Sequence, residues 1–141
     1  MLCVEKINND NMEKIISFLT SVPSISTIDE NIIKNSAAII DDDKVVGSIS
    51  FEQYDSIGLI RYFVFKRNMS NELLKNMIDS LNTTAIQKGI TELVCIADNV
   101  PVFELFTELG FKEINKNIFI NEEKSINTSY GNSDFLSKRI I

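Results

Sequence analysis

Residues 99–111, NVPVFELFTELGF, form the most sharply bounded segment of the sequence. Asn99 is a favourable N-cap residue, Pro101 fits the first turn of a helix, and Gly110 suits the left-handed residue at which helices often end. The apolar residues between these ends recur at helical spacing and share one face, namely Val102, Leu105, Phe106 and Leu109. The stretch therefore predicts a short helix with one face packed against the rest of the protein.

On either side of this segment, the spacing of the apolar residues alternates between the period of a strand and that of a helix. Strands are expected within 2–7, 36–40, 45–54, 59–65, 91–97, 112–120 and 134–141, and helices within 9–22, 24–35, 70–88 and 99–110. Ser26 or Thr27 is the expected cap of the second helix. The acids Asp41–Asp43 lie between two strands, so they indicate a hairpin turn rather than a calcium site. No repeat or long linker divides the sequence, which predicts one domain over residues 1–141.

Composition excludes several classes of function. The net charge of −6 argues against a nucleic acid or an anionic membrane as the main partner. No apolar run approaches the roughly 20 residues that span a bilayer, and charge begins at Glu5, so a cytoplasmic protein is expected. Histidine is absent, which excludes catalysis by the chain's own imidazole. Cys3 and Cys95 have no metal-binding spacing, so free thiols and no metal site are expected.

The order of the expected elements and two motifs together resemble the GNAT superfamily of acyl-coenzyme A-dependent N-acyltransferases. DDDKVVGSISF, residues 41–51, is similar to the family's hairpin in which an acidic turn leads to an apolar pair and a glycine. The family's late helix commonly reads Asn, two residues, Ala, two residues, Leu-Tyr, two residues, Leu-Gly-Phe. Residues 99–111 keep that spacing with two substitutions, Val102 for Ala and Phe106 for Tyr.

This resemblance implies an α/β (α+β) fold with a GNAT-like mixed, mostly antiparallel central sheet flanked by helices on both faces. It implies an acetyl-coenzyme A (acetyl-CoA)-dependent N-acetyltransferase acting on a small-molecule amine, as a monomer or homodimer. Such an enzyme works by holding the amine and the thioester together and by stabilising the oxyanion with backbone N–H groups.

The resemblance also implies a binding site for acetyl-CoA. The expected cofactor-binding residues are Phe63, Val64, Phe65, Lys66, Arg67, Asn68, Met69, Ser70, Asn71, Asn99 and Phe106. The family holds the pyrophosphate with a glycine-rich loop, but residues 59–88 contain no glycine, and Glu72 and Leu74 stand where glycines are expected in one register. The side chains of Lys66 and Arg67 could contact a phosphate instead, or the segment could be an exposed basic loop.

The expected catalytic groups also depart from the family. Phe106 occupies the place of a tyrosine proposed to protonate the leaving thiolate, and phenylalanine has no proton to give. Residues 56–71 contain no Asp or Glu, so Glu52 or Asp55 is the candidate base, unless both are solvated turn charges. Among the three tyrosines, Tyr62 is the preferred candidate for a replacement hydroxyl.

Two other readings of the sequence stay open. One is a non-catalytic module with a GNAT-like fold that binds a metabolite or a protein partner. The other is a dimerisation domain that uses residues 134–141, DFLSKRII, as an exposed edge strand. The loop at residues 65–71 would distinguish the non-catalytic module from the enzyme, because converging backbone amides there would favour a phosphate ligand.

Overall fold

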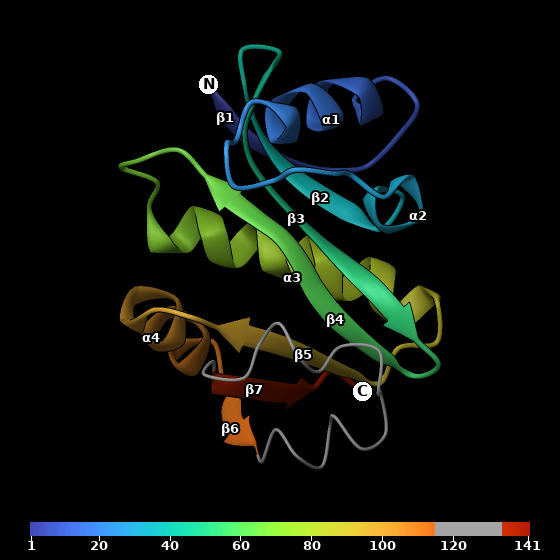
Figure 1. Ribbon diagram of the computed structural model, residues 1–141, viewed down its shortest axis with the longest axis vertical. Coiled ribbons are helices and arrows are strands. Elements are labelled where there is room, and N and C mark those ends of the chain that lie inside the picture. Colours follow the sequence, from blue (N-terminus) through green and yellow to red (C-terminus); the bar gives the residue numbers. More distant parts are fainter. Residues whose placement is uncertain (115–133) are drawn as a thin grey trace.

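The computed structural model describes residues 1–114 and 134–141, and its strands form one seven-stranded sheet in the order β1-β2-β3-β4-β5-β7-β6 (Figure 1). The strands are β1 (Leu2–Lys6), β2 (Ser36–Asp41), β3 (Lys44–Tyr54), β4 (Ile57–Phe65), β5 (Glu92–Ala97), β6 (Lys112–Ile114) and β7 (Asp134–Arg139). The helices are α1 (Met12–Thr20), α2 (Glu30–Ile33), α3 (Asn71–Gln87) and α4 (Val100–Glu108). Within the described residues, this is the order of elements predicted from the sequence.

The sheet is mixed and mostly antiparallel, as predicted. Each neighbouring pair of strands is antiparallel except β4 and β5, which run parallel and are connected by α3. The C-terminal strand β7 is not an exposed edge, because it pairs with β5 along its whole length and with β6 through residues 135–137. The expectation that this strand forms a free edge for dimerisation is therefore wrong.

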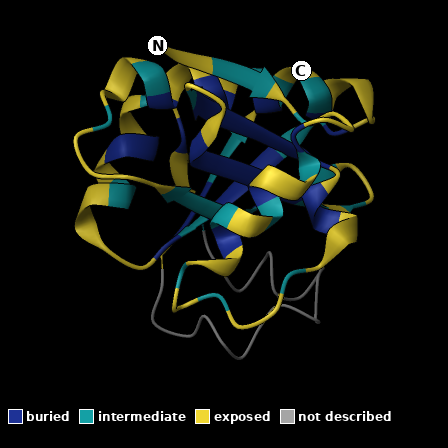
Figure 2. Cartoon of the chain, turned by 90° about the horizontal axis from the view of Figure 1, so that it is seen from above, coloured by how far each residue is buried: buried dark blue, intermediate teal, exposed yellow. Residues whose placement is uncertain are grey.

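Helices cover both faces of the sheet, and alternate strand residues explain why. On β2, Ala37 and Ile39 pack in the cluster that contains the buried face of α3 and α4, whereas Ala38 and Ile40 pack with α1 and α2. Figure 1 shows α3 behind the sheet and α1 and α2 in front of it. Figure 2 shows that the buried residues concentrate in the central strands between these layers.

The acidic segment at residues 41–44 is a hairpin turn, as predicted. Asp42 and Asp43 have positive φ angles of 47° and 70°, and Asp41 pairs with Lys44 across the turn. Two consecutive left-handed residues match the twist of the flanking strands, and aspartate tolerates this conformation. Among the described residues, no group of three or more metal-binding side chains is close enough to hold a metal ion.

The second helix begins later than predicted. Its N-cap is Asp29, whose Oδ1 accepts a hydrogen bond from the backbone N–H of Asn31 at 2.9 Å, instead of Ser26 or Thr27. The reason lies outside the segment, because the Thr27 carbonyl and the Asp29 N–H contact the hydroxyl of Tyr62 on β4.

Part of the expected C-terminal region lies outside the described residues. The strand expected over 112–120 is observed over Lys112–Ile114, and the remainder, with the polar stretch that contains Tyr130, lies outside the described residues. None of the helices described here has the length and apolar character needed to cross a membrane.

Candidate functional site

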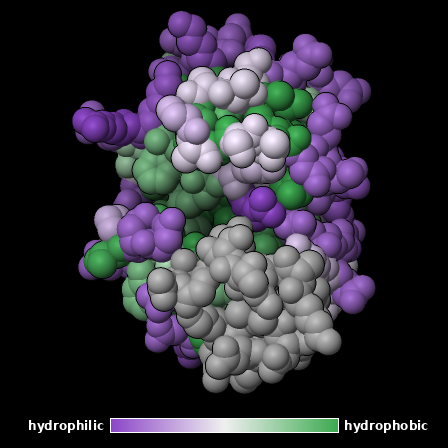
Figure 3. Space-filling view, in the orientation of Figure 1, coloured by the Kyte–Doolittle hydropathy of each residue, from purple (hydrophilic) through white to green (hydrophobic). Residues whose placement is uncertain are grey.

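Strands β4 and β5 separate part of the way along their length. Ile57–Leu59 pair with Glu92–Val94, and no residues beyond them are paired between these two strands in the described chain. A cavity of about 280 Å³ lies where the strands part. Its walls are residues 60–63 of β4, Cys95 and Ile96 of β5, and Asp98, Asn99 and Val102 at the start of α4. Figure 3 shows a recess on this face of the molecule with hydrophobic atoms at its floor.

Helix α4 is bounded as its sequence predicts. The Asn99 side chain accepts a hydrogen bond from the Val102 N–H at 2.9 Å, Pro101 lies in the first turn, and Gly110 has a φ of 94°. These ends place Asn99 and Val102 at the cavity wall. The sharp capping of a nine-residue helix therefore positions two residues of the site.

Phe106 is fully buried, which confirms that this face of the helix packs against the rest of the protein. Its ring contacts Phe63 of β4 at 5.4 Å and Phe111 at 5.0 Å between centroids, both edge to face. Because Phe106 has no exposed surface, it supports the cavity wall through Phe63, while Val102, one turn earlier, lines the cavity itself.

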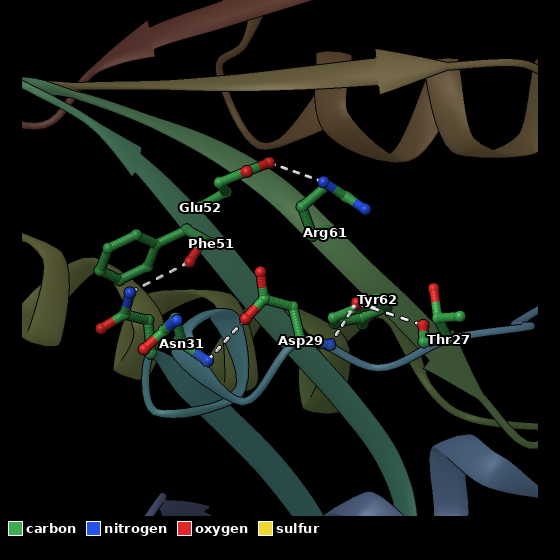
Figure 4. A network of polar contacts seen from close by, with 8 residues as sticks. Thr27, Asp29, Asn31, Phe51, Glu52, Arg61 and Tyr62 are labelled. Carbon is green, nitrogen blue, oxygen red and sulfur yellow. Dashed lines mark hydrogen bonds and ion pairs between the residues drawn. The ribbon is translucent and has the colours of Figure 1, made fainter. Parts of the chain in front are cut away.

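The candidate base Glu52 is engaged with an arginine. Its Oε1 accepts a hydrogen bond from Arg61 Nη1 at 2.6 Å, and both side chains are about a third exposed or less (Figure 4). The alternative, Asp55, is exposed in the β3–β4 turn, where it has a φ of 53°. Glu52 therefore lies next to a cavity-lining residue, whereas Asp55 has the role of a turn residue.

The hydroxyl of Tyr62 contacts backbone groups. It accepts a hydrogen bond from the Asp29 N–H at 3.0 Å and donates to the Thr27 carbonyl oxygen at 3.4 Å (Figure 4). Tyr54 packs in a different cluster, with Leu59 and Val94. Among the tyrosines that the structure describes, Tyr62 is thus the one at the cavity.

The loop between β4 and α3 makes its turn without glycine. Asn68 has a left-handed φ of 66°, a conformation that asparagine tolerates. Ser70 caps α3 by accepting a hydrogen bond from the Leu73 N–H at 3.1 Å. The N–H groups of Asn71 and Glu72, in the first turn of an exposed helix end, have no partner within the helix. Lys66 and Arg67 are exposed just before this turn.

Three residues that were not predicted as site residues from the sequence line the cavity. They are Arg61, Cys95 and Asp98. Burial, with a smaller contribution from Asp98, raises the pKa of the Cys95 thiol to about 12. Asp98 could have been noticed as the residue before the Asn99 cap, but the positions of Arg61 and Cys95 depend on which strands lie side by side.

Comparison of this fold with solved structures finds close similarity to acetyltransferases. N-acetylglutamate synthase from Neisseria gonorrhoeae, solved with coenzyme A and N-acetyl-glutamate, has a TM-score of 0.75 and 15% identity over 100% of this chain and 35% of its own. An acetyltransferase of the GNAT family from Staphylococcus aureus has a TM-score of 0.70 and 15% identity over 100% of both chains. Aminoglycoside 6'-acetyltransferase type Ii has a TM-score of 0.71 and 14% identity over 99% of this chain and 97% of its own.

These similarities define the class of fold. The protein has the fold of the GNAT acetyltransferases, as the sequence predicted, although it spans only about a third of the N-acetylglutamate synthase chain, at 35%. At the level of sequence, neither a family model nor a curated protein matches the chain.

Proposed function

We propose that the protein is a cytoplasmic, acetyl-CoA-dependent N-acetyltransferase that acts on a small amine. The observation that carries this proposal is the separation of β4 from β5, which leaves one edge of β4 unpaired with its neighbour beyond Leu59. An unpaired strand edge offers alternating N–H and C=O groups to an extended ligand. The pantetheine arm of acetyl-CoA is such a ligand, because it is an extended chain with two amide groups.

The loop after β4 supports binding of the pyrophosphate. The N–H groups of Asn71 and Glu72, which have no partner within the helix, carry the positive end of the α3 dipole, and Lys66 and Arg67 lie a few residues earlier in the same loop. The Glu72 carboxylate opposes an anion at the same place. These residues therefore fit acetyl-CoA, with affinity set by the balance between the amides and basic side chains on one side and Glu72 on the other.

Acetyl-CoA would supply the activated acetyl group as a thioester. In this proposal the Asn99 end of α4 and the β4 edge hold it near the cavity, and Glu52 is the residue that takes a proton from the amine. Arg61 orients that carboxylate through their ion pair. Most of the rate enhancement would come from proximity and from backbone N–H groups of β4, since Phe106 cannot act as an acid.

A thermal-shift titration with acetyl-CoA tests this proposal. A ligand at about 100 times its dissociation constant stabilises a fold by roughly 2.7 kcal/mol, which raises the melting temperature of a domain of this size by several degrees. We expect a shift that appears at high ligand concentration and shrinks in Lys66→Ala and Arg67→Ala. Glu72→Gln should enlarge it, because the repelling charge is removed. Lys112→Ala is the matched control, since Lys112 is an exposed lysine on the edge strand β6.

The opposite outcomes are equally clear. No shift at millimolar acetyl-CoA would contradict the proposal, and equal changes in Lys66→Ala and Lys112→Ala would remove the loop from the binding site. The rival function is a non-catalytic module, which the burial of Phe106 favours, because a phenylalanine stands where an acetyltransferase would use a proton donor. A thermal shift without thiol release on any of a panel of amines would favour this rival.

A further inference from the structure

The Tyr62 side chain reaches its position through a bulge in β4. Ser48 pairs with Val64 and Ser50 pairs with Arg61, so two residues of β4 stand opposite one residue of β3. Tyr62 has a φ of 51°, which is uncommon for a bulky residue. Such backbone strain persists only where the surrounding structure holds it, and it is concentrated at functional sites.

The bulge changes which face each side chain occupies. The Arg61 guanidinium lies 5.4 Å from the Tyr62 ring centroid, so these consecutive residues lie close together instead of on opposite faces. Phe63 then packs with Phe106 in the cluster under α3 and α4, whereas Tyr62 packs in the cluster of α1 and α2. The bulge therefore orients the Tyr62 side chain toward the segment that connects α1 to α2.

The hydroxyl of Tyr62 holds that segment by its backbone. Residues 27–29 belong to no strand or helix and pair with no strand in the described part of the chain, so contacts with other side chains are what fix their backbone. Tyr62, more than 30 residues away along the chain, accepts from the Asp29 N–H and contacts the Thr27 carbonyl (Figure 4). One side chain thus satisfies both polar groups that flank Ile28, which packs in the same cluster as the tyrosine.

Tyr62 belongs to one hollow and contacts the wall of another. It is one of the residues that line the cavity between β4 and β5, and the segment that its hydroxyl contacts, residues 27–31, lines a second, open hollow of about 620 Å³ together with Ile16 of α1. Through its contacts with Thr27 and Asp29, Tyr62 therefore links the wall of the cavity to this segment. Movement of this segment would change the shape of the second hollow and leave the α3 end of the site unaltered.

We propose that the Tyr62 hydroxyl is a positioning group, which holds residues 27–31 as one wall of the binding site for the acceptor amine. This rests on the proposed acetyltransferase function. In this role the Tyr62 hydroxyl contacts the backbone of Thr27 and Asp29 and is not assigned as the proton donor to the leaving thiolate. Loss of the hydroxyl should weaken acceptor binding and leave acetyl-CoA binding and the chemical step almost unchanged.

Tyr62→Phe tests the proposal because it removes the hydroxyl and keeps the ring against Arg61. The first measurement is amide hydrogen exchange by NMR on the whole chain, which does not depend on any activity. Loss of a typical hydrogen bond should make the Asp29 amide exchange about 3 to 10 times faster. Tyr54→Phe is the matched control, because Tyr54 packs in a different cluster, and it should leave that rate unchanged. Equal exchange at Asp29 in the parent and in Tyr62→Phe would overturn the proposal.

The second measurement is steady-state kinetics with an accepted small amine. Tyr62→Phe should raise the KM for the amine about 3- to 10-fold, with kcat and the KM for acetyl-CoA changed by less than about twofold. A fall in kcat of about 100-fold with an unchanged amine KM would overturn the proposal and make Tyr62 the proton donor. A parent protein without activity on any amine would contradict the proposed function and the acceptor role, whereas the exchange result would still show whether the hydroxyl holds the segment.

Discussion

The two ends of the β4–β5 pair are built differently. At the closed end, Ile57–Leu59 pair with Glu92–Val94, and Gly58 allows close packing, because a Cβ there would lie 2.8 Å from Leu93 Cδ2. At the open end the strands do not pair, and the cavity between them has charged and polar residues in its walls, including Arg61 and Asp98. The comparison shows that the same pair of strands is closed over apolar side chains at one end and borders a cavity with charged and polar residues at the other.

Aromatic residues pack behind the wall of the open end. Phe63 packs edge to face on Phe106, which packs in turn on Phe111, and this group lies on the α4 side of the sheet. The strands of the open end therefore border a cavity whose wall is supported by a buried apolar cluster. A ligand that pairs with β4 would not have to separate the two strands first.

The largest expected effect lies at the closed end. Leu93→Ala should lower the free energy of unfolding by about 3 kcal/mol, because Leu93 is fully buried and the truncation leaves a cavity. Ile96→Ala at the open end should cost less than about 1.5 kcal/mol, since Ile96 is partly exposed at the cavity wall. Urea denaturation measures both values. Equal losses would remove the distinction between the two ends.

An intermediate effect on stability is expected at Phe106, which supports the cavity wall at the open end. Phe106→Tyr should lower the free energy of unfolding by about 1 to 3 kcal/mol, because a hydroxyl would enter a fully buried apolar cluster. Phe63→Tyr is the comparison, and it should cost clearly less because Phe63 is partly exposed at the cavity. An unchanged stability of Phe106→Tyr would mean that the hydroxyl reaches the cavity, and position 106 would then contact a ligand.

The smallest effect concerns pH and Cys95 at the open end. Burial raises the pKa of its thiol from 9.0 to about 12, so between these values the folded chain keeps a proton that the unfolded chain has released. The contribution of Cys95 to stability is therefore fully present below pH 9 and is lost as pH rises toward 12. By pH 10 the loss should be about 1 kcal/mol. Urea denaturation at pH 8 and pH 10 measures it.

Cys95→Ala is the control for this last prediction, because other groups also titrate at high pH. The variant should lose less stability between pH 8 and pH 10 than the parent. Equal losses in both proteins would show that the Cys95 thiolate is accommodated in the folded chain, and that the open end admits more water than its burial indicates.

Local sequence determined the types, order and several boundaries of the elements. Asn99, Pro101 and Gly110 mark the ends of α4 through contacts with neighbouring residues, and alternation along β2 distributes its side chains between two faces. These features depend on residues a few positions apart, so the sequence is sufficient to predict them. The resemblance of residues 99–111 to the GNAT helix is of the same local kind.

Tertiary structure alone decided the details of the site. The start of α2 depends on Tyr62, more than 30 residues away, and the walls of the cavity depend on which residues of β4, β5 and α4 lie side by side. The pairing of β7 between β5 and β6 is equally non-local. Each of these outcomes is set by which segments become neighbours, and that choice follows from burying the whole core rather than from the preference of any one segment.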